Sequence, residues 1–323
     1  MIKSYHICLT SCGEVLFRSK EDFYRGVNCY AISLIKHNST NLADCFMSNH
    51  VHFVIQSDDV YGVIKKFKVS YTMYFNNKYG REGKLFNDLN FVIEVEGLYH
   101  HLCVMSYVMR NPLHHGVAPT PYAYEHSSAN IIYKKELGKF SDNELLKKAH
   151  YRKYIGKDSK VPNNIRINSS GMILREDFTD VILVERMYST ARSFNYYMSR
   201  KSSEEWLKEQ KLDQSGNSII DLRTIEKGIL FGNDAKTSQH SKTIEVHYLK
   251  MLNNESGRCN YGKISDTDLC TIINDYCITQ YRKRSIYFLT ESEKSSLARL
   301  LMKKYNPGTN QLYRCLGHKD SNS

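Results

Sequence analysis

The nine cysteines of the sequence form no Cys-x-x-Cys pair, and their number is odd. This pattern excludes a disulfide scaffold and a zinc ribbon, and it favours reduced thiols in a cytoplasmic protein. No apolar run approaches the roughly 18 residues of a membrane span. The N-terminal stretch from Tyr5 to Thr10 is also too short and too polar in its flanks for a signal peptide. We therefore expect a cytoplasmic chain with no membrane partner.

Acidic residues are in the minority, and the excess positive charge is unevenly distributed. The net charge is +11 over 323 residues, a length that suits one or two domains. Up to residue 125 there are 12 Lys and Arg against 11 Asp and Glu, whereas the remainder has 33 against 23. A basic balance favours a polyanion such as nucleic acid as partner. Charge alone is equally compatible with an ordinary soluble basic surface.

One stretch carries a possible metal site: Met47-Ser48-Asn49-His50-Val51-His52, with an apolar run behind it. Side chains alternate faces along a strand, so His50 and His52 share one face and Val51 points to the other. Two adjacent imidazoles supply half of the ligands of a divalent metal site. The same pattern also occurs as an exposed pair, or as one histidine bonded at a strand end. Other parts of the chain have to decide between these interpretations.

Apolar periodicity over the first 95 residues predicts six elements in the order β-α-β-β-α-β. Ser19 is a suitable N-cap for the first helix, and Asp58-Asp59 can cap the second. We expect strands at 3–10, 41–47, 50–56 and 91–95, and helices at 19–37 and about 60–79. This order predicts an α+β fold of ferredoxin-like type, with an antiparallel sheet and helices on one face.

A third helix is expected from Gly97 to Asn111, where Pro112 should stop it. Tyr107 and Asn111 are four residues apart, so they lie one turn apart on one face of this helix. A phenol can act as a nucleophile, and an amide oxygen can bind a hard metal ion. Taken alone, the pair is equally compatible with a packed tyrosine and a helix-stop residue.

Taken together, these segments resemble the REP-associated tyrosine transposases, which belong to the single-tyrosine HUH insertion-sequence transposases. The resemblance covers about residues 1–128, with the motifs in the order and spacing of the family. The histidine pair alone is a weak signal, whereas the ordered set is specific. The matching segments are the 47–52 stretch, Tyr71-Thr72-Met73-Tyr74-Phe75-Asn76, Tyr79-Gly80-Arg81-Glu82-Gly83, and Tyr107-Val108-Met109-Arg110-Asn111-Pro112 followed by Gly116 and Val117.

The resemblance implies a transposase that cleaves and rejoins single-stranded DNA, usually at hairpins formed by short palindromic repeats. His50, His52 and Asn111 would bind Mg²⁺ or Mn²⁺. Tyr107 would attack the DNA, form a 5′-phosphotyrosine link and free a 3′-OH. The enzyme would act as a monomer or a homodimer. We expect basic side chains to contact the DNA, namely Lys65, Lys66, Lys68, Arg81 and Arg314.

The sequence departs from the family pattern at two places. Ser48 stands where the family often has proline before Asn-His. The loop at 86–91 also lacks the Arg and Phe that family members commonly carry after the second helix, which would weaken or redirect DNA binding. The four expected site residues are intact, so we still expect activity.

The resemblance ends near residue 128. We expect residues 129–260 to be mainly helical, with helices at 142–154, 178–198 and 203–211 and loops at 212–241, and we assign them no role. Residues 261–323 should form helices at 265–280, 294–305 and 309–316. The last two, joined by Pro307-Gly308, resemble a truncated helix-turn-helix for DNA binding. A small helical cap with a basic surface fits the pattern about as well.

Two other functions remain open on the sequence. One is a catalytically silent descendant of a transposase that only binds hairpin DNA. The other is a plasmid relaxase or a rolling-circle initiator, which also uses the histidine pair. The order and surroundings of the motifs differ from those of the second class, and the retained Tyr107 and Asn111 argue against the first.

Overall fold

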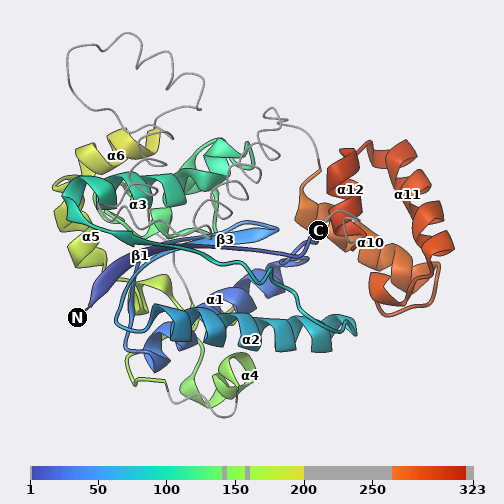
Figure 1. The fold of residues 1–323 in the computed structure, drawn as a ribbon, viewed down its shortest axis with the longest axis horizontal. Helices are drawn as coiled ribbons and strands as arrows, with labels where there is room; N and C mark the ends of the chain where they lie inside the picture. Colours follow the sequence, from blue (N-terminus) through green and yellow to red (C-terminus); the bar gives the residue numbers. More distant parts are fainter. Residues whose placement is uncertain (1, 140–143, 157–160, 200–263, 318–323) are drawn as a thin grey trace, which may run out of the picture.

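The computed structural model describes residues 2–139, 144–156, 161–199 and 264–317 (Figure 1). The helix predicted at 203–211 and the loops predicted at 212–241 lie outside these residues. The described part contains a four-stranded antiparallel sheet, helices on both of its faces and a helical module at its C-terminus. No helix within this part is long and apolar enough to cross a membrane.

The four strands lie in the order β2-β3-β1-β4, and every neighbouring pair is antiparallel. This is the strand order of a ferredoxin-like sheet, so the predicted α+β class is confirmed. The observed strands are within about one residue of those expected at each end. Their bounds are β1 (Lys3–Thr10), β2 (Thr40–Phe46), β3 (His50–Ser57) and β4 (Phe91–Val95).

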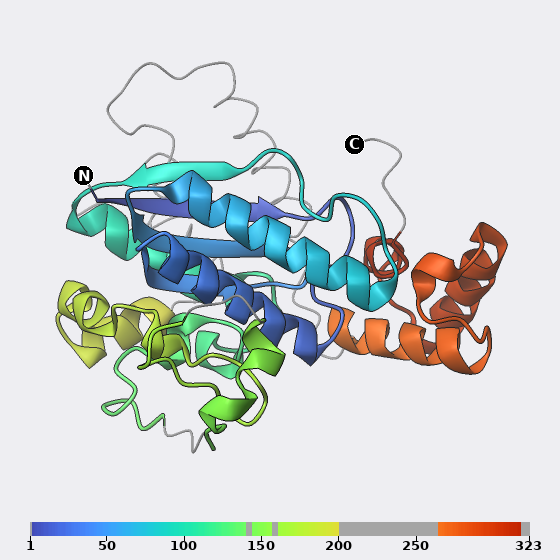
Figure 2. The same cartoon turned by 90° about the horizontal axis from the view of Figure 1, so that it is seen from below.

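Helices α1 (Lys20–Lys36) and α2 (Val60–Tyr79) pack against one face of the sheet (Figures 1 and 2). Ser19 begins α1 with a capping box that includes Asp22, as its sequence predicts. Gly80 ends α2 in the left-handed conformation, with φ of 65°. Alternate apolar residues of β3 point to this face and form a core with the two helices, namely Val51, Phe53 and Ile55.

The opposite face of the sheet is covered by α3 (Gly97–His114), together with α5 (Val181–Tyr188) and α6 (Ala191–Ser199). Contrary to the prediction, α3 does not stop at Asn111 and runs on through Pro112. A proline removes only its own N–H donor, and the helix ends two residues later, so few bonds are lost. The helix end is held by a bond from the His115 N–H to the Asn111 carbonyl, at 3.0 Å.

The described residues between 129 and 199 are less helical than their sequence indicates. Of the helix predicted at 142–154, the described residues contain only η3 (Lys148–His150) and the one-turn α4 (Arg152–Ile155). The helix predicted at 178–198 is divided into α5 and α6 by Ser189, whose φ is 67°. The other short 3-10 turns are η1 (Pro121–Ala123), η2 (Ser128–Asn130), η4 (Arg175–Asp177) and η5 (Ile286–Phe288).

The C-terminal module has its own apolar core and lies at one end of the sheet (Figure 1). It consists of α10 (Asp266–Thr279), α11 (Glu291–Tyr305) and α12 (Thr309–Cys315), close to the three predicted helices. Thr290 and Glu293 form a capping box at the start of α11. The module is attached to the sheet domain by hydrogen bonds, among them one from Arg18 Nη1 to the Cys315 carbonyl oxygen at 2.9 Å.

Candidate active site between the sheet and α3

The structure brings the four predicted site residues together in the space between β3 and α3. His50 and His52 both point toward α3, with ring centroids 5.1 Å apart and ring planes nearly perpendicular. The Tyr107 ring lies 5.5 Å from that of His52. One turn further along α3, Asn111 Oδ1 lies 3.1 Å from His50 Nε2. All four side chains are buried.

Three further histidines border this site, and none was among the predicted site residues. His115 follows the end of α3, and its ring centroid lies 5.5 Å from that of His50. The neighbouring His114 ring lies 6.4 Å from the ring of Tyr107. His6 enters from β1. A helix that ended at Asn111 would not have placed His114 and His115 beside the site. These two histidines were therefore missed because the end of the helix was predicted too early.

His6 supports His52 from behind. Its Nε2 lies 3.1 Å from His52 Nδ1, and the two rings are stacked with centroids 5.3 Å apart. One of the two nitrogens must donate the shared proton, which fixes the tautomers as a pair. The other nitrogen of His52, Nε2, lies 3.9 Å from Cys8 Sγ. The sequence feature that could have indicated this contact is the spacing of His6 and Cys8, which are two residues apart in the first strand and so lie on the same face of the sheet.

Burial keeps the histidines at the back of the site uncharged. Burial holds the pKa of His52 well below its ordinary value, and the proximity of other histidines acts in the same direction. Burial, with a smaller effect of His100, lowers the pKa of His6 to about 3. A neutral imidazole has the lone pair that a metal ion requires.

His50 and Asn111 are suited in chemistry and spacing to a small divalent cation. His50 Nδ1 lies 2.9 Å from Asn49 Oδ1 and Nε2 lies 3.1 Å from Asn111 Oδ1, so a neutral His50 donates to one of the two oxygens; with the proton on Nδ1, the lone pair of Nε2 faces Asn111. Two ligands at right angles around an octahedral ion of this size lie about 3 Å apart. The opposite orientation of the Asn111 amide would instead let Nδ2 donate to Nε2. As drawn, Nδ2 is buried without a partner among the described residues.

The ring nitrogens of His52 do not point toward His50 and Asn111. Its two nitrogens face His6 and Cys8 on β1, so it would join His50 and Asn111 only after its ring turns. Apart from this set, which includes an asparagine, no three His, Cys, Asp or Glu side chains of the described residues are arranged to hold a metal ion. The amide oxygen of Asn111 is a donor that suits Mg²⁺ or Mn²⁺, whereas the two imidazoles suit the later divalent transition metals better, and the orientation of the third donor does not fit in this conformation.

The predicted DNA-contacting lysines lie on the other face of the sheet from Tyr107. All three belong to α2, namely Lys65, Lys66 and Lys68. Lys68 is committed to local bonds, because its Nζ donates to the Asn87 carbonyl at 2.6 Å and to Asn90 Oδ1 at 2.9 Å. Lys65 is exposed. A nucleic acid held by these side chains would lie on the α2 side of the sheet.

Arg81, which was predicted to contact DNA, is buried and bonded within the protein. Arg81 is 8% exposed, and its Nε donates to Glu14 Oε1 at 2.9 Å. Its two terminal nitrogens bond to that carboxylate, to the Asn76 side chain and to the carbonyl oxygens of residues 82–84. The guanidinium therefore fixes the loop after α2. Arg314 similarly forms a two-pronged ion pair with Asp266, at 2.8 and 3.1 Å.

Ser48, which stands where the related family often has proline, joins the site to the C-terminal module. Its hydroxyl donates to Asp266 Oδ2 at 2.7 Å, on the same carboxylate that Arg314 contacts. Its carbonyl oxygen accepts bonds from the N–H groups of Leu16 and Phe17. The residue two positions before His50 is therefore held from both sides.

No protein-family model matches the chain, and no curated protein is similar to it. Among solved structures, the chain is similar to one described as "Structure of the REP associates tyrosine transposase bound to a REP hairpin". The two are 12% identical with a TM-score of 0.36, over 42% of this chain and 81% of the other. The likeness is a distant one and assigns neither an activity nor a residue role.

Proposed function

We propose that the chain is an HUH-type DNA transposase that cleaves and rejoins single-stranded DNA, with Tyr107 as nucleophile. The observation that supports this proposal is one arrangement of side chains. Tyr107 and Asn111 project from one face of α3 onto the two histidines of β3, with Asn111 Oδ1 3.1 Å from His50 Nε2. A nucleophile beside a set of neutral nitrogen and oxygen donors suits phosphoryl transfer.

The reaction would exchange one phosphodiester for another. The phenol oxygen of Tyr107 bonds to phosphorus as the bond to the 3′ oxygen breaks, and the phenol proton is balanced by the proton that the freed 3′-OH gains. The tyrosine ester conserves the energy of the broken bond. A second 3′-OH can therefore reverse the step and join strands, which suits transposition better than hydrolysis.

The chain's own residues would position the phosphate and support the metal site. A free phenol has a pKa of about 10 and is a weak nucleophile at neutral pH. Bound Mg²⁺ or Mn²⁺ would supply neutralisation of the phosphate charge. His50 and Asn111 would hold the ion, with His52 as third ligand. His6 holds His52 in its present orientation, so the His52 ring would have to leave this bond to become the third ligand.

A second function is favoured by one specific observation. Because both nitrogens of His52 face β1, His52 does not complete the site of His50 and Asn111 in this conformation. A protein that keeps this conformation would bind hairpin DNA without cleaving it. The two functions differ in whether a covalent bond to DNA forms.

The test is to incubate the protein with labelled single-stranded DNA from the flanks of its own gene, with Mn²⁺, and to run a denaturing protein gel. We expect a labelled band at the mass of the protein. The band should disappear in Tyr107→Phe and in His50→Ala, and it should persist in Tyr99→Phe, which removes an exposed phenol from the same helix. Tight hairpin binding without any adduct, unaffected by Tyr107→Phe, would instead establish the binding protein.

A further inference from the structure

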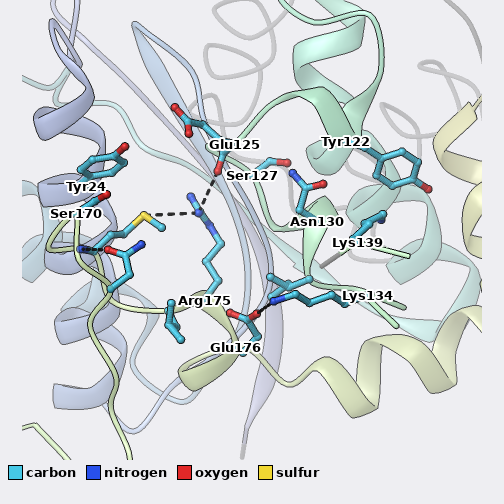
Figure 3. Close-up of a pocket in the computed structure, with 14 residues that line it drawn as sticks. Tyr24, Tyr122, Glu125, Ser127, Asn130, Lys134, Lys139, Ser170, Arg175 and Glu176 are labelled. Atoms are coloured by element: carbon cyan, nitrogen blue, oxygen red, sulfur yellow. Dashed lines mark hydrogen bonds and ion pairs between the residues drawn. The ribbon is translucent and has the colours of Figure 1, made fainter. Parts of the chain in front are cut away.

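A second cavity lies at the β2 edge of the sheet, separate from the space around Tyr107 (Figure 3). Its volume is about 420 Å³, within the range of roughly 300–1,000 Å³ of small-molecule sites. Its walls come from α1, from the segment 122–139 and from the segment 168–176. Three cationic side chains line it, namely Lys134, Lys139 and Arg175.

Arg175 is a buried cation with an unused donor. Its side chain is only 4% exposed, and its Nε pairs with Asp44 Oδ2 of β2 at 2.9 Å. Its Nη1 donates to the Glu125 carbonyl oxygen at 3.3 Å. Its Nη2 is buried and has no hydrogen-bond partner among the described residues. A buried charged donor without an acceptor is costly, so this nitrogen calls for an acceptor from outside the described chain.

Lys139 is a second cation that its surroundings do not neutralise. Its Nζ lies 3.6 Å from the centroid of the Tyr122 ring and donates to the Ala129 carbonyl oxygen at 3.1 Å. Burial lowers the pKa of Lys139 to about 8, which is the effect expected when no carboxylate compensates. An anion bound beside it would supply that compensation.

The acidic side chains of the cavity are already paired with other cations. Glu176 accepts a bond from Lys134 Nζ at 2.9 Å. Glu125 lies 3.5 Å from Lys20 Nζ and is more than half exposed at the rim. Lys139 therefore retains positive charge that can act on a ligand, and Arg175, although paired with Asp44, retains an unused N–H donor. Figure 3 shows them on opposite sides of the cavity, with Asn130 and Ser127 along one wall between them.

Aromatic rings add a second kind of contact. Tyr122 and Tyr24 line opposite sides of the cavity and are half-buried (Figure 3). A tyrosine ring can stack on any nucleobase. An apolar or sugar ligand would leave Lys139 without a counter-charge. Charge and rings together favour a ligand that carries both a phosphate and a base.

We propose that this cavity binds one nucleotide, with its phosphate attracted by Arg175 and Lys139 and its base placed against a tyrosine ring. The nucleotide would be free, or part of a DNA strand. A DNA strand could extend from this cavity to the candidate active site, because the two are close. Ser127, which lines the cavity, pairs through its backbone with Cys45 of β2, and Cys45 pairs with His52 of β3. The proposal does not depend on the chemistry of Tyr107.

The first test measures binding by calorimetry on the full chain with inorganic phosphate, with dAMP and with a five-residue single-stranded oligonucleotide. We expect dAMP to bind, and Lys139→Met to weaken its binding by roughly tenfold or more, as loss of a charged hydrogen bond does. The matched control is Lys153→Met, because Lys153 is exposed and lies over the ring of Tyr154, 5.4 Å from its centroid, outside the cavity. The Lys153→Met variant should bind dAMP with the affinity of the unaltered protein.

The arms of this test identify the source of the nucleotide. An oligonucleotide that binds more than tenfold tighter than dAMP, with the advantage lost in Lys139→Met, would assign the site to a DNA strand. Equal affinities would assign it to a free nucleotide. Because Arg175 also holds Asp44, Arg175→Met would disturb folding, and Lys139→Met is the variant that decides.

A second measurement locates the ligand directly. Limited acetylation followed by mass spectrometry should modify Lys139 faster than an ordinary lysine, since its pKa is about 8. Saturating dAMP or oligonucleotide should protect Lys139 and leave Lys153 as reactive as before. Binding that Lys139→Met and Lys153→Met weaken alike, or binding of neither ligand at millimolar concentration, would overturn the proposal. Tyr107→Phe should retain nucleotide binding. Failure of the nucleotide-binding proposal can therefore be distinguished from failure of the proposed transposase function, which the adduct test measures.

Discussion

His6 illustrates how a single side chain can act on chemistry that it does not touch. It lies behind His52, with Nε2 3.1 Å from Nδ1, and stacks on the same ring. This bond holds the His52 ring away from His50 and Asn111. We therefore predict that His6→Ala frees the ring and strengthens Mn²⁺ binding, by about tenfold if one ring orientation in ten is competent in the unaltered protein, measured by titration calorimetry.

The control for this prediction is His37→Ala, which removes a histidine paired with Asp59 outside the site. It should bind Mn²⁺ like the unaltered protein. If His6→Ala also binds Mn²⁺ with unaltered affinity, His6 has no role in orienting His52.

Buried neutral histidines also make stability depend on pH. Burial, helped by the charge of Arg175, holds the pKa of His126 well below its ordinary value of about 6.5. Glu125 lies 3.4 Å away but is largely exposed, so it does not offset burial. The unfolded chain therefore binds a proton near pH 6 that the folded chain does not. The stability contribution is complete above about pH 6.5 and is lost as the pH falls below it.

We predict that His126→Phe removes this contribution, because a phenyl ring keeps the stacking on Phe23, whose centroid lies 3.8 Å from that of His126. Between pH 7.5 and pH 5.5, the free energy of unfolding should fall by about 1 kcal/mol less in the variant than in the unaltered protein. Urea unfolding at the two pH values measures this difference. His6 and His52 add the same trend, so the remaining slope should stay positive, and equal slopes in both proteins would refute the assignment.

At the scale of elements, Asp266 is the joint between the C-terminal module and the candidate site. It receives hydrogen bonds from Ser48 Oγ, from Gln311 and from two nitrogens of Arg314. Asp266→Ala leaves the Arg314 guanidinium without its carboxylate. We predict a loss of about 1–3 kcal/mol in the stability of the module, seen as faster amide hydrogen exchange in α10 and α12.

Asp275→Asn is the matched substitution for this experiment, because Asp275 is an exposed acidic residue of the same helix. It should leave exchange in both helices unaltered. Equal exchange in Asp266→Ala and Asp275→Asn would show that the joint contributes nothing to the stability of the module.

Which elements could be predicted from the sequence follows from where their stabilising bonds lie. The capping boxes at Ser19 and Thr290 are made within four residues, so local sequence predicts both helix starts. The strand order likewise follows from alternation and short connections. The 142–154 segment instead packs without a long helix: Tyr151 and Ile155 bury against the core of α1 and α2, and no local pattern records that contact.

The candidate site divides in the same way. His50, His52, Tyr107 and Asn111 were found because each pair lies on one element at a fixed spacing. His6 and His115 come from other elements and meet His52 and His50 only through strand register and the continuation of α3 past Pro112. The burial of Arg81 against Glu14 is equally a tertiary fact, since 67 residues separate the two.

At the scale of the whole molecule, the sheet separates the predicted lysine contacts from the predicted chemistry. Tyr107 lies on the α3 side, whereas Lys65 and Lys66 lie on the α2 side. A folded hairpin and the single strand that runs from it would then occupy different faces. If α2 contacts the hairpin, Lys65→Ala/Lys66→Ala should weaken hairpin binding and reduce its salt slope by about 2, because two phosphate contacts are lost.

Fluorescence anisotropy of a labelled hairpin across a series of salt concentrations measures this slope. Lys36→Ala, at the end of α1, removes an exposed charge from the same side of the molecule and is the control. A slope reduced only in the double variant would place the hairpin on α2. A slope unaltered by the double variant would exclude α2 as a DNA contact. The hairpin would then have to be held on the α3 side with Tyr107, or by the C-terminal module. That module contacts Ser48, two residues before His50, and so lies close enough to the candidate site to hold DNA that enters it.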